Sequence, residues 1–97
     1  MLRHIVLLTL SPDASDSDVE AIIEGLEGLP AIIPEIQSYS VGRDAGLAEG
    51  NSTLAIIGEF TDAAAYQVYA DHPVHRQVIT ERIVPFLAGR AAVQHEF

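Results

Sequence analysis

The stretch RHIVLLTL, residues 3–10, opens the chain with a run of leucine and β-branched residues. The apolar run that starts after His4 is too short for a buried helix, and its composition favours a β-strand. Successive side chains of a strand point to opposite faces of a sheet. Apolar residues occupy both sets here, with Val6, Leu8 and Leu10 on one side and Ile5 and Leu7 on the other. The pattern therefore predicts a strand that is buried on both faces.

Three further segments predict strands. TLAIIGEF, residues 53–60, is also apolar on both sides, with Leu54 and Ile56 against Ala55 and Ile57. EIQSYSVGR, residues 35–43, alternates between two sets of side chains, as strands do. RAAVQHEF, residues 90–97, places Ala91, Val93, His95 and Phe97 on one side.

Two helical regions separate these strands. After the acidic turn SPDASDSD, either Ser15 or Ser17 can cap a helix, and Ser17 with Glu20 fits a capping box. An apolar stripe follows at steps of three and four residues, and Gly28 and Pro30 end this helix. The stripe consists of Val19, Ile22, Ile23, Leu26 and Leu29.

The second helical region is interrupted. Thr61 or Asp62 caps its first part, and the sequence Asp71–His72 breaks it. Pro73 then suits the first position of a new helical segment, where its missing N–H has no cost. Helical spacing of apolar residues continues to Phe86. We expect Pro85 to end or kink this segment and Gly89 to cap it.

The predicted order is β-α-β-β-α-β, which indicates an α+β, ferredoxin-like fold with an antiparallel four-stranded sheet. Both helical regions of such a fold lie on one face of the sheet, yet two strands are apolar on both faces. A second copy packed sheet against sheet would cover the free apolar face, so we expect a homodimer that forms a dimeric α/β barrel. A monomer with a partly apolar surface is the alternative.

Composition limits the possible partners. The 97 residues are expected to form one domain, residues 1–97, with a formal net charge of -9 and no lysine or cysteine. Such a charge argues against nucleic acid and against anionic membrane surfaces. No apolar stretch approaches the ~20 residues of a membrane span. We interpret the N-terminal residues as a strand and not as a signal peptide, and expect a cytoplasmic protein.

The segment YADHPVHR, residues 69–76, holds two of the four histidines. With Pro73 at the first helical position, His75 lies in the first turn, where the helix dipole disfavours imidazolium. A neutral His75 suits a general base, and Tyr69 could donate a hydrogen bond to a developing oxyanion. His4 could face the same cavity. The alternative is structural: His72 and His75 cap and pack, His4 fills the interior, and Tyr69 is a core aromatic.

A metal site is a weaker hypothesis. His72 and His75 would need a further ligand from elsewhere in the chain, and Pro73 restricts their geometry. We therefore predict no metal. We also expect no organic cofactor. His95, near the end of the chain, is assigned no role.

Taken in order, several motifs of the chain resemble the stress-responsive A/B barrel family, also called Dabb. They are RHIVLLTL, GLPAIIPEI, YSVGRD, LAIIGEF, YADHPVH and VPFL. The resemblance implies a homodimer in which two sheets pack into a barrel. A plant cyclase of this family closes a linear polyketide by aldol condensation without metal or organic cofactor, and its key positions correspond to His4, Tyr69 and His75. The resemblance thus implies a catalytic role for these three residues, and we assign His72 to ligand binding.

The leading functional hypothesis is a homodimer that binds a hydrophobic or phenolic small molecule in a cavity between sheet and helices. It includes cofactor-free acid–base catalysis, as in a cyclase or isomerase. Two alternatives stay open, because a fold does not fix a function. One is a non-catalytic dimer of the stress response whose cavity is filled, and the other is a cofactor-independent monooxygenase.

Overall fold

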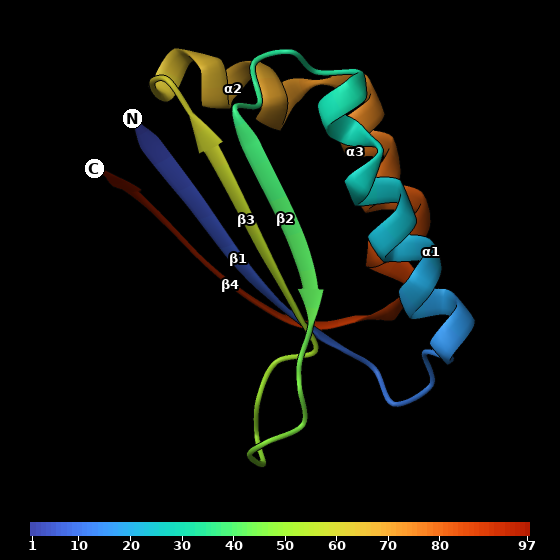
Figure 1. Cartoon of the computed structure of the whole chain (residues 1–97). Coiled ribbons are helices and arrows are strands. Elements are labelled where there is room, and N and C mark those ends of the chain that lie inside the picture. The colour runs from blue at the N-terminus through green and yellow to red at the C-terminus, as the bar shows by residue number, and fades with distance from the viewer.

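The computed structural model describes residues 1–97 and contains one antiparallel four-stranded sheet with all helices on one side of it (Figure 1). The strand order is β2-β3-β1-β4, with the two central strands flanked by β2 and β4 at the edges. The strands are β1 (Leu2–Leu10), β2 (Ser38–Arg43), β3 (Leu54–Phe60) and β4 (Leu87–Glu96). This arrangement confirms the predicted α+β, ferredoxin-like fold.

The helices follow the predicted order around these strands. The first region consists of α1 (Asp16–Glu27) and a short 3-10 turn, η1 (Leu29–Ala31). The second consists of α2 (Ala63–Asp71), α3 (Pro73–Val78), a π-helical turn η2 (Ile79–Ile83) and a 3-10 turn η3 (Val84–Phe86). None of them is long and apolar enough to cross a membrane.

The N-terminal caps follow one of the two predicted alternatives in each case. Ser15 caps α1, because its side chain accepts the N–H of Asp18 while the Asp18 carboxylate accepts the N–H of Ser15. The proposed capping box of Ser17 with Glu20 is therefore wrong, since Ser17 already lies within the first helical turn. Asp62 caps α2 by accepting the N–H of Ala65 at 2.8 Å.

The expected cap at Gly89 is also wrong. The chain leaves the helical region at Leu87, whose extended backbone begins β4, and Gly89 lies inside that strand opposite Thr9. The register between β1 and β4 shifts between Thr9 and Leu10, so β4 holds one extra residue there. Pro85 sits in the last helical turn, where its fixed φ and missing N–H help to end the helix.

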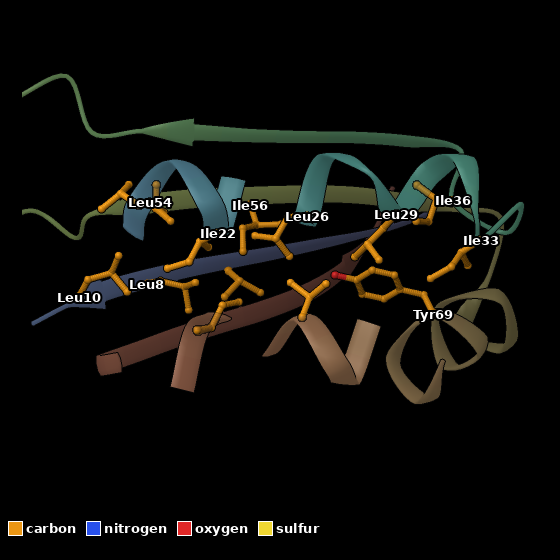
Figure 2. Packing of buried hydrophobic residues seen from close by; sticks show 14 of the residues in the cluster. Leu8, Leu10, Ile22, Leu26, Leu29, Ile33, Ile36, Leu54, Ile56 and Tyr69 are labelled. Carbon is orange, nitrogen blue, oxygen red and sulfur yellow. The ribbon is translucent and has the colours of Figure 1, made fainter. Parts of the chain in front are cut away.

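The core lies between the sheet and the helices. The even-numbered residues of β1 face it, and all five are buried. From α1 it receives Val19, Ile22 and Leu26, three members of the predicted stripe. Figure 2 shows Ile22 next to Leu8, Leu26 next to Ile56, and Tyr69 toward the other end of the cluster. His4 is the only polar residue among the buried ones.

The opposite face of the sheet has no covering layer in the single chain (Figure 1). Two apolar rows cross it, one formed by Ile57, Ile5 and Val93 and the next by Ala55, Leu7 and Ala91. Leu7 and Val93 are 40% and 53% exposed. The prediction that β1 and β3 are apolar on both faces is confirmed, and we call these two rows the open face.

Candidate functional site

Three elements bring the predicted residues His4, Tyr69 and His75 together. His4 comes from β1, Tyr69 from α2 and His75 from α3. The Tyr69 ring lies against both histidines, with centroid distances of 5.9 Å to His4 and 4.1 Å to His75. Tyr69 and His4 are 2% and 4% exposed, so the cluster is part of the core. In Figure 2 the Tyr69 hydroxyl points inward, among buried aliphatic side chains.

The helix start at Pro73 orients His75. Its Nδ1 lies 3.2 Å from the backbone carbonyl oxygen of Ala70. Because a carbonyl only accepts, Nδ1 carries a proton and donates it to this bond. Burial lowers the pKa of His75, more than the backbone hydrogen bond to Ala70 raises it. A neutral ring in this tautomer leaves Nε2 with a free lone pair, as a general base requires.

The opposite tautomer is favoured at His4. The side-chain nitrogen Nε2 of Gln94 lies 2.8 Å from Nδ1 of His4. An amide nitrogen donates, so Nδ1 accepts and the ring proton lies on Nε2. Burial, with smaller contributions from Arg90 and His75, lowers the pKa of His4 to about 4. Near neutral pH, His4 is therefore an uncharged hydrogen-bond donor.

Two tyrosines complete the polar part of the cluster. The hydroxyls of Tyr39 and Tyr69 lie 2.8 Å apart and share one hydrogen bond. Burial raises the pKa of Tyr69 to about 12 and raises that of Tyr39 as well. Both phenols stay protonated at neutral pH. Tyr66 closes the group, with its ring centroid 4.9 Å from that of His4.

Sequence reasoning missed Tyr39, Tyr66 and Gln94 as members of this cluster. Gln94 and His4 are directly opposite each other in the β1–β4 pairing. Gln94 could be identified only from the register of the antiparallel pairing between the first and last strands.

His72 lies in the same segment but has a capping role. It is the N-cap residue of α3, and its Nδ1 accepts the N–H of Val74 at 3.1 Å. This is the structural alternative considered for it, and its assignment to ligand binding stays a prediction. No group of three or more His, Cys, Asp or Glu side chains is placed to hold a metal ion.

No cavity is lined by His4, Tyr69 or His75. A cavity of about 70 Å³ lies nearby on the same face of the sheet, between Val6 of β1 and the η2 turn. Its other lining residues are Leu8, Ile56, Ile79, Ile83, Leu87 and Arg90. Val6 follows His4 by two residues, so the cavity and the histidine are neighbours along one face of β1.

Solved structures share this fold closely. A dimeric ferredoxin-like protein of unknown function from Thermobifida fusca is 38% identical, with a TM-score of 0.91 over 99% of this chain and 90% of that one. A similar dimeric protein of unknown function from Bacteroides fragilis is 29% identical, with a TM-score of 0.88, covering 99% and 95% of the two chains. A hydroxynitrile lyase from Passiflora edulis is 21% identical, with a TM-score of 0.84 and coverage of 97% and 90%, and shows the fold alone. No curated protein matches the chain.

The sequence also fits a family model along almost its whole length. The model describes the stress responsive A/B barrel domain and matches residues 2–97. This range includes every strand, every helix and the histidine motif. A match of this extent confirms the resemblance seen in the motifs, and the chain belongs to the stress-responsive A/B barrel (Dabb) family.

Proposed function

We propose that the protein is a homodimeric acid–base enzyme for a hydrophobic or phenolic carbonyl compound, with His75 as general base. The observation that supports this most is the pair of neutral histidines in opposite tautomers, both with their rings next to that of Tyr69. One ring offers a lone pair and the other offers an N–H. Proton abstraction next to a carbonyl needs both, since a base takes the proton while donors stabilise the new oxyanion.

In the proposed reaction, Nε2 of His75 removes a proton from the carbon beside a substrate carbonyl. The electron pair moves onto the carbonyl oxygen, and the enolate accepts hydrogen bonds from Nε2–H of His4 and from the Tyr69 hydroxyl. Tyr39 then donates to Tyr69, so that the Tyr69 proton is free for the substrate. The enolate attacks a second carbonyl carbon, and His75 returns its proton to the resulting alkoxide.

The dimer is part of the same proposal. The open face presents apolar side chains from three strands, and water contact with such a face is unfavourable. The Thermobifida fusca and Bacteroides fragilis proteins are described as dimeric. Pairing of two open faces leaves the His4–Tyr69–His75 cluster on the helix side of each sheet, within a single chain.

The burial of the cluster favours a second candidate, a non-catalytic dimer whose cavity is filled. Tyr69 is 2% exposed, and the side chains of Phe60 and Tyr66 pack against it. A substrate would have to displace part of this packing or enter from the cavity beside Val6. A test of the proposal therefore has to detect proton abstraction itself.

Deuterium exchange into simple ketones provides that test. Phenylacetone and pentan-2-one are incubated with the protein in D2O, and loss of the α-proton signals is followed by NMR. We expect the protein to accelerate exchange, and we expect His75→Ala to remove at least about a hundredfold of that acceleration. His95→Ala is the matched control, because His95 is exposed and its side chain lies on the face of the sheet opposite to that of His4 and Gln94.

The melting temperature of each variant shows whether the fold is retained. If the wild-type protein accelerates no exchange, or if a folded His75→Ala variant exchanges as fast as wild type, the acid–base assignment is wrong. The non-catalytic dimer then becomes the better description.

A further inference from the structure

Arg90 differs from the other four arginines of the chain. Arg3, Arg43 and Arg76 form ion pairs with Glu59, Asp16 and Asp71, respectively. Arg82 donates a hydrogen bond to the backbone carbonyl of Ala21. The guanidinium of Arg90 makes neither an ion pair nor a hydrogen bond. In a chain with 14 acidic and five basic residues, Arg90 is thus the one arginine whose guanidinium has no polar partner.

The surroundings of Arg90 are apolar. It lies on β4 opposite Leu8, on the side of the sheet that faces the helices. Together with six hydrophobic residues it lines the cavity of about 70 Å³. Arg90 itself is exposed, and it is the only charged residue of this lining.

This cavity adjoins the histidine cluster. Val6, which lines it, is two residues from His4 on the same face of β1. After burial, the charge of Arg90 is the next cause of the lowered pKa of His4, and the same charge opposes the rise that burial causes in the pKa of Tyr69, which is consistent with this proximity. An anion that binds Arg90 would thus be held beside the hydrogen-bond donors of the cluster.

We propose that Arg90 and this cavity form a binding site for a carboxylate with a small apolar body. The guanidinium would bind the carboxylate, for which its planar set of N–H donors is suited. A volume of about 70 Å³ is about half that of a cavity of roughly 150 Å³ that holds a benzene ring, so it accepts a short alkyl end or the edge of a ring. The substrate class that follows is an apolar carboxylic acid, such as a keto acid, and this extension rests on the proposed acid–base function.

Pairs of ligands with the same shape but different charge test whether the negative charge contributes to binding. Pentanoate is compared with pentanamide and benzoate with benzamide, each titrated into the full-length 15N-labelled protein at low salt and followed by amide chemical shifts. We expect each acid to bind about fivefold more tightly than its amide, because an exposed guanidinium–carboxylate pair is worth up to roughly that factor. The shifts should be largest for residues around Val6, Ile79 and Arg90.

Two variants complete the test. Arg90→Gln should remove the preference for the acids and leave the affinity for the amides unchanged. Arg43→Gln is the matched control, because it removes the same charge from an exposed arginine at a different place on the surface, and it should keep the preference. Melting temperatures of both variants are compared with wild type.

The site is wrong if the wild-type protein binds acids and amides equally, if it binds neither, or if Arg43→Gln loses the preference as much as Arg90→Gln. The outcome is independent of catalysis. If the wild-type protein binds the acids more tightly than the amides but does not accelerate deuterium exchange into ketones, the proposed enzyme is rejected and the carboxylate site is retained. If deuterium exchange depends on His75 but acids and amides bind equally, the carboxylate site is rejected and the proposed enzyme is retained.

Discussion

His4 is a polar side chain in a core that is otherwise aliphatic and aromatic. Its burial is tolerated because Gln94 satisfies Nδ1 and because the ring stays uncharged. A buried imidazole without a partner would cost about 1–3 kcal/mol. The residue is therefore held in one tautomer by a neighbour from the opposite end of the chain.

This arrangement predicts how stability depends on pH. The pKa of His4 is about 4 in the folded protein and 6.5 when exposed. Between these values the unfolded chain binds a proton that the folded chain does not, so the free energy of unfolding falls as the pH is lowered from 6.5 towards 4. We expect a loss on the order of 2–3 kcal/mol from His4. His75 acts in the same direction, since its pKa is lowered too.

Urea denaturation of wild type and His4→Gln at several pH values measures this effect. The variant should show a clearly smaller loss between pH 6.5 and 4, because glutamine does not titrate. The Glu59 carboxylate, whose pKa is lowered from 4.5 by Ser38 and Arg3, begins to lose its contribution as the pH falls through 4.5, and it does so in both proteins. If the free energy of unfolding falls equally in the two proteins between pH 6.5 and 4, the pKa of His4 is not lowered in the folded protein.

For single residues, the sequence predicts the face of the sheet on which a side chain lies better than it predicts the hydrogen-bond partner of that side chain. The alternation along β1 places His4 on the same side as Val6 and Leu8, and the structure confirms it. Gln94 was not predicted, because its place opposite His4 depends on the β1–β4 register, and the extra residue near Thr9 and Leu10 changes that register. A bulge of this kind leaves no clear mark in the hydrophobic pattern.

Helix starts are decided by a few backbone hydrogen bonds, as α1 illustrates. Ser15 and Ser17 both precede an apolar stripe, and both are good capping residues. Only Ser15 has an extended backbone and a carboxylate three residues later that returns to its N–H. Ser17 instead contacts Ser15 through its hydroxyl, at 3.0 Å. Local pattern thus found the cap to within two residues and could not choose between them.

The two serines provide a matched pair of variants. Ser15→Ala removes the acceptor for the Asp18 N–H and should lower the free energy of unfolding by about 1 kcal/mol. Ser17→Ala removes only an exposed hydroxyl contact and should change it by less than about 0.5 kcal/mol. Guanidinium denaturation of the two variants at one pH measures the difference. Equal losses would contradict the assignment of the cap to Ser15.

The same limit applies at the far end of the second helical region. Apolar spacing correctly predicted that this region continues to Phe86, because those side chains face the sheet. The apolar spacing did not predict the residue at which the helical region ends. Glycine is a common C-cap residue, but Gly89 is a strand residue here. Pairing of β4 with β1 begins at Leu87, and this tertiary contact overrides the local preference.

For the molecule as a whole, the two-sided apolar pattern of β1 and β3 is the feature of the sequence with the widest consequence. It predicted a sheet with one face on the helices and another apolar face outside, and the exposed fractions of 40% for Leu7 and 37% for Ile57 agree. The chain alone does not state what covers this face. A second copy is the partner that a two-fold axis makes available, because an isologous contact uses the same surface on both subunits.

Charge substitution on the open face tests the dimer. We expect the wild-type protein to sediment as a dimer at micromolar concentration, and Leu7→Glu to sediment as a monomer, because the change would bury a carboxylate of each copy in an apolar contact. Val68→Glu is the control, since Val68 is 47% exposed but lies on α2, away from the open face. It should leave the dimer intact.

Salt should shift the same equilibrium in a defined direction. Each copy has a formal charge of -9, so two copies repel each other and screening by salt should tighten the dimer. Pairing through charged groups would have the opposite salt dependence. A wild-type protein that sediments as a monomer at micromolar concentration in both low and moderate salt, or a Leu7→Glu variant that stays dimeric, would place the contact elsewhere or remove it. The open face would then be a surface that the single chain exposes to water.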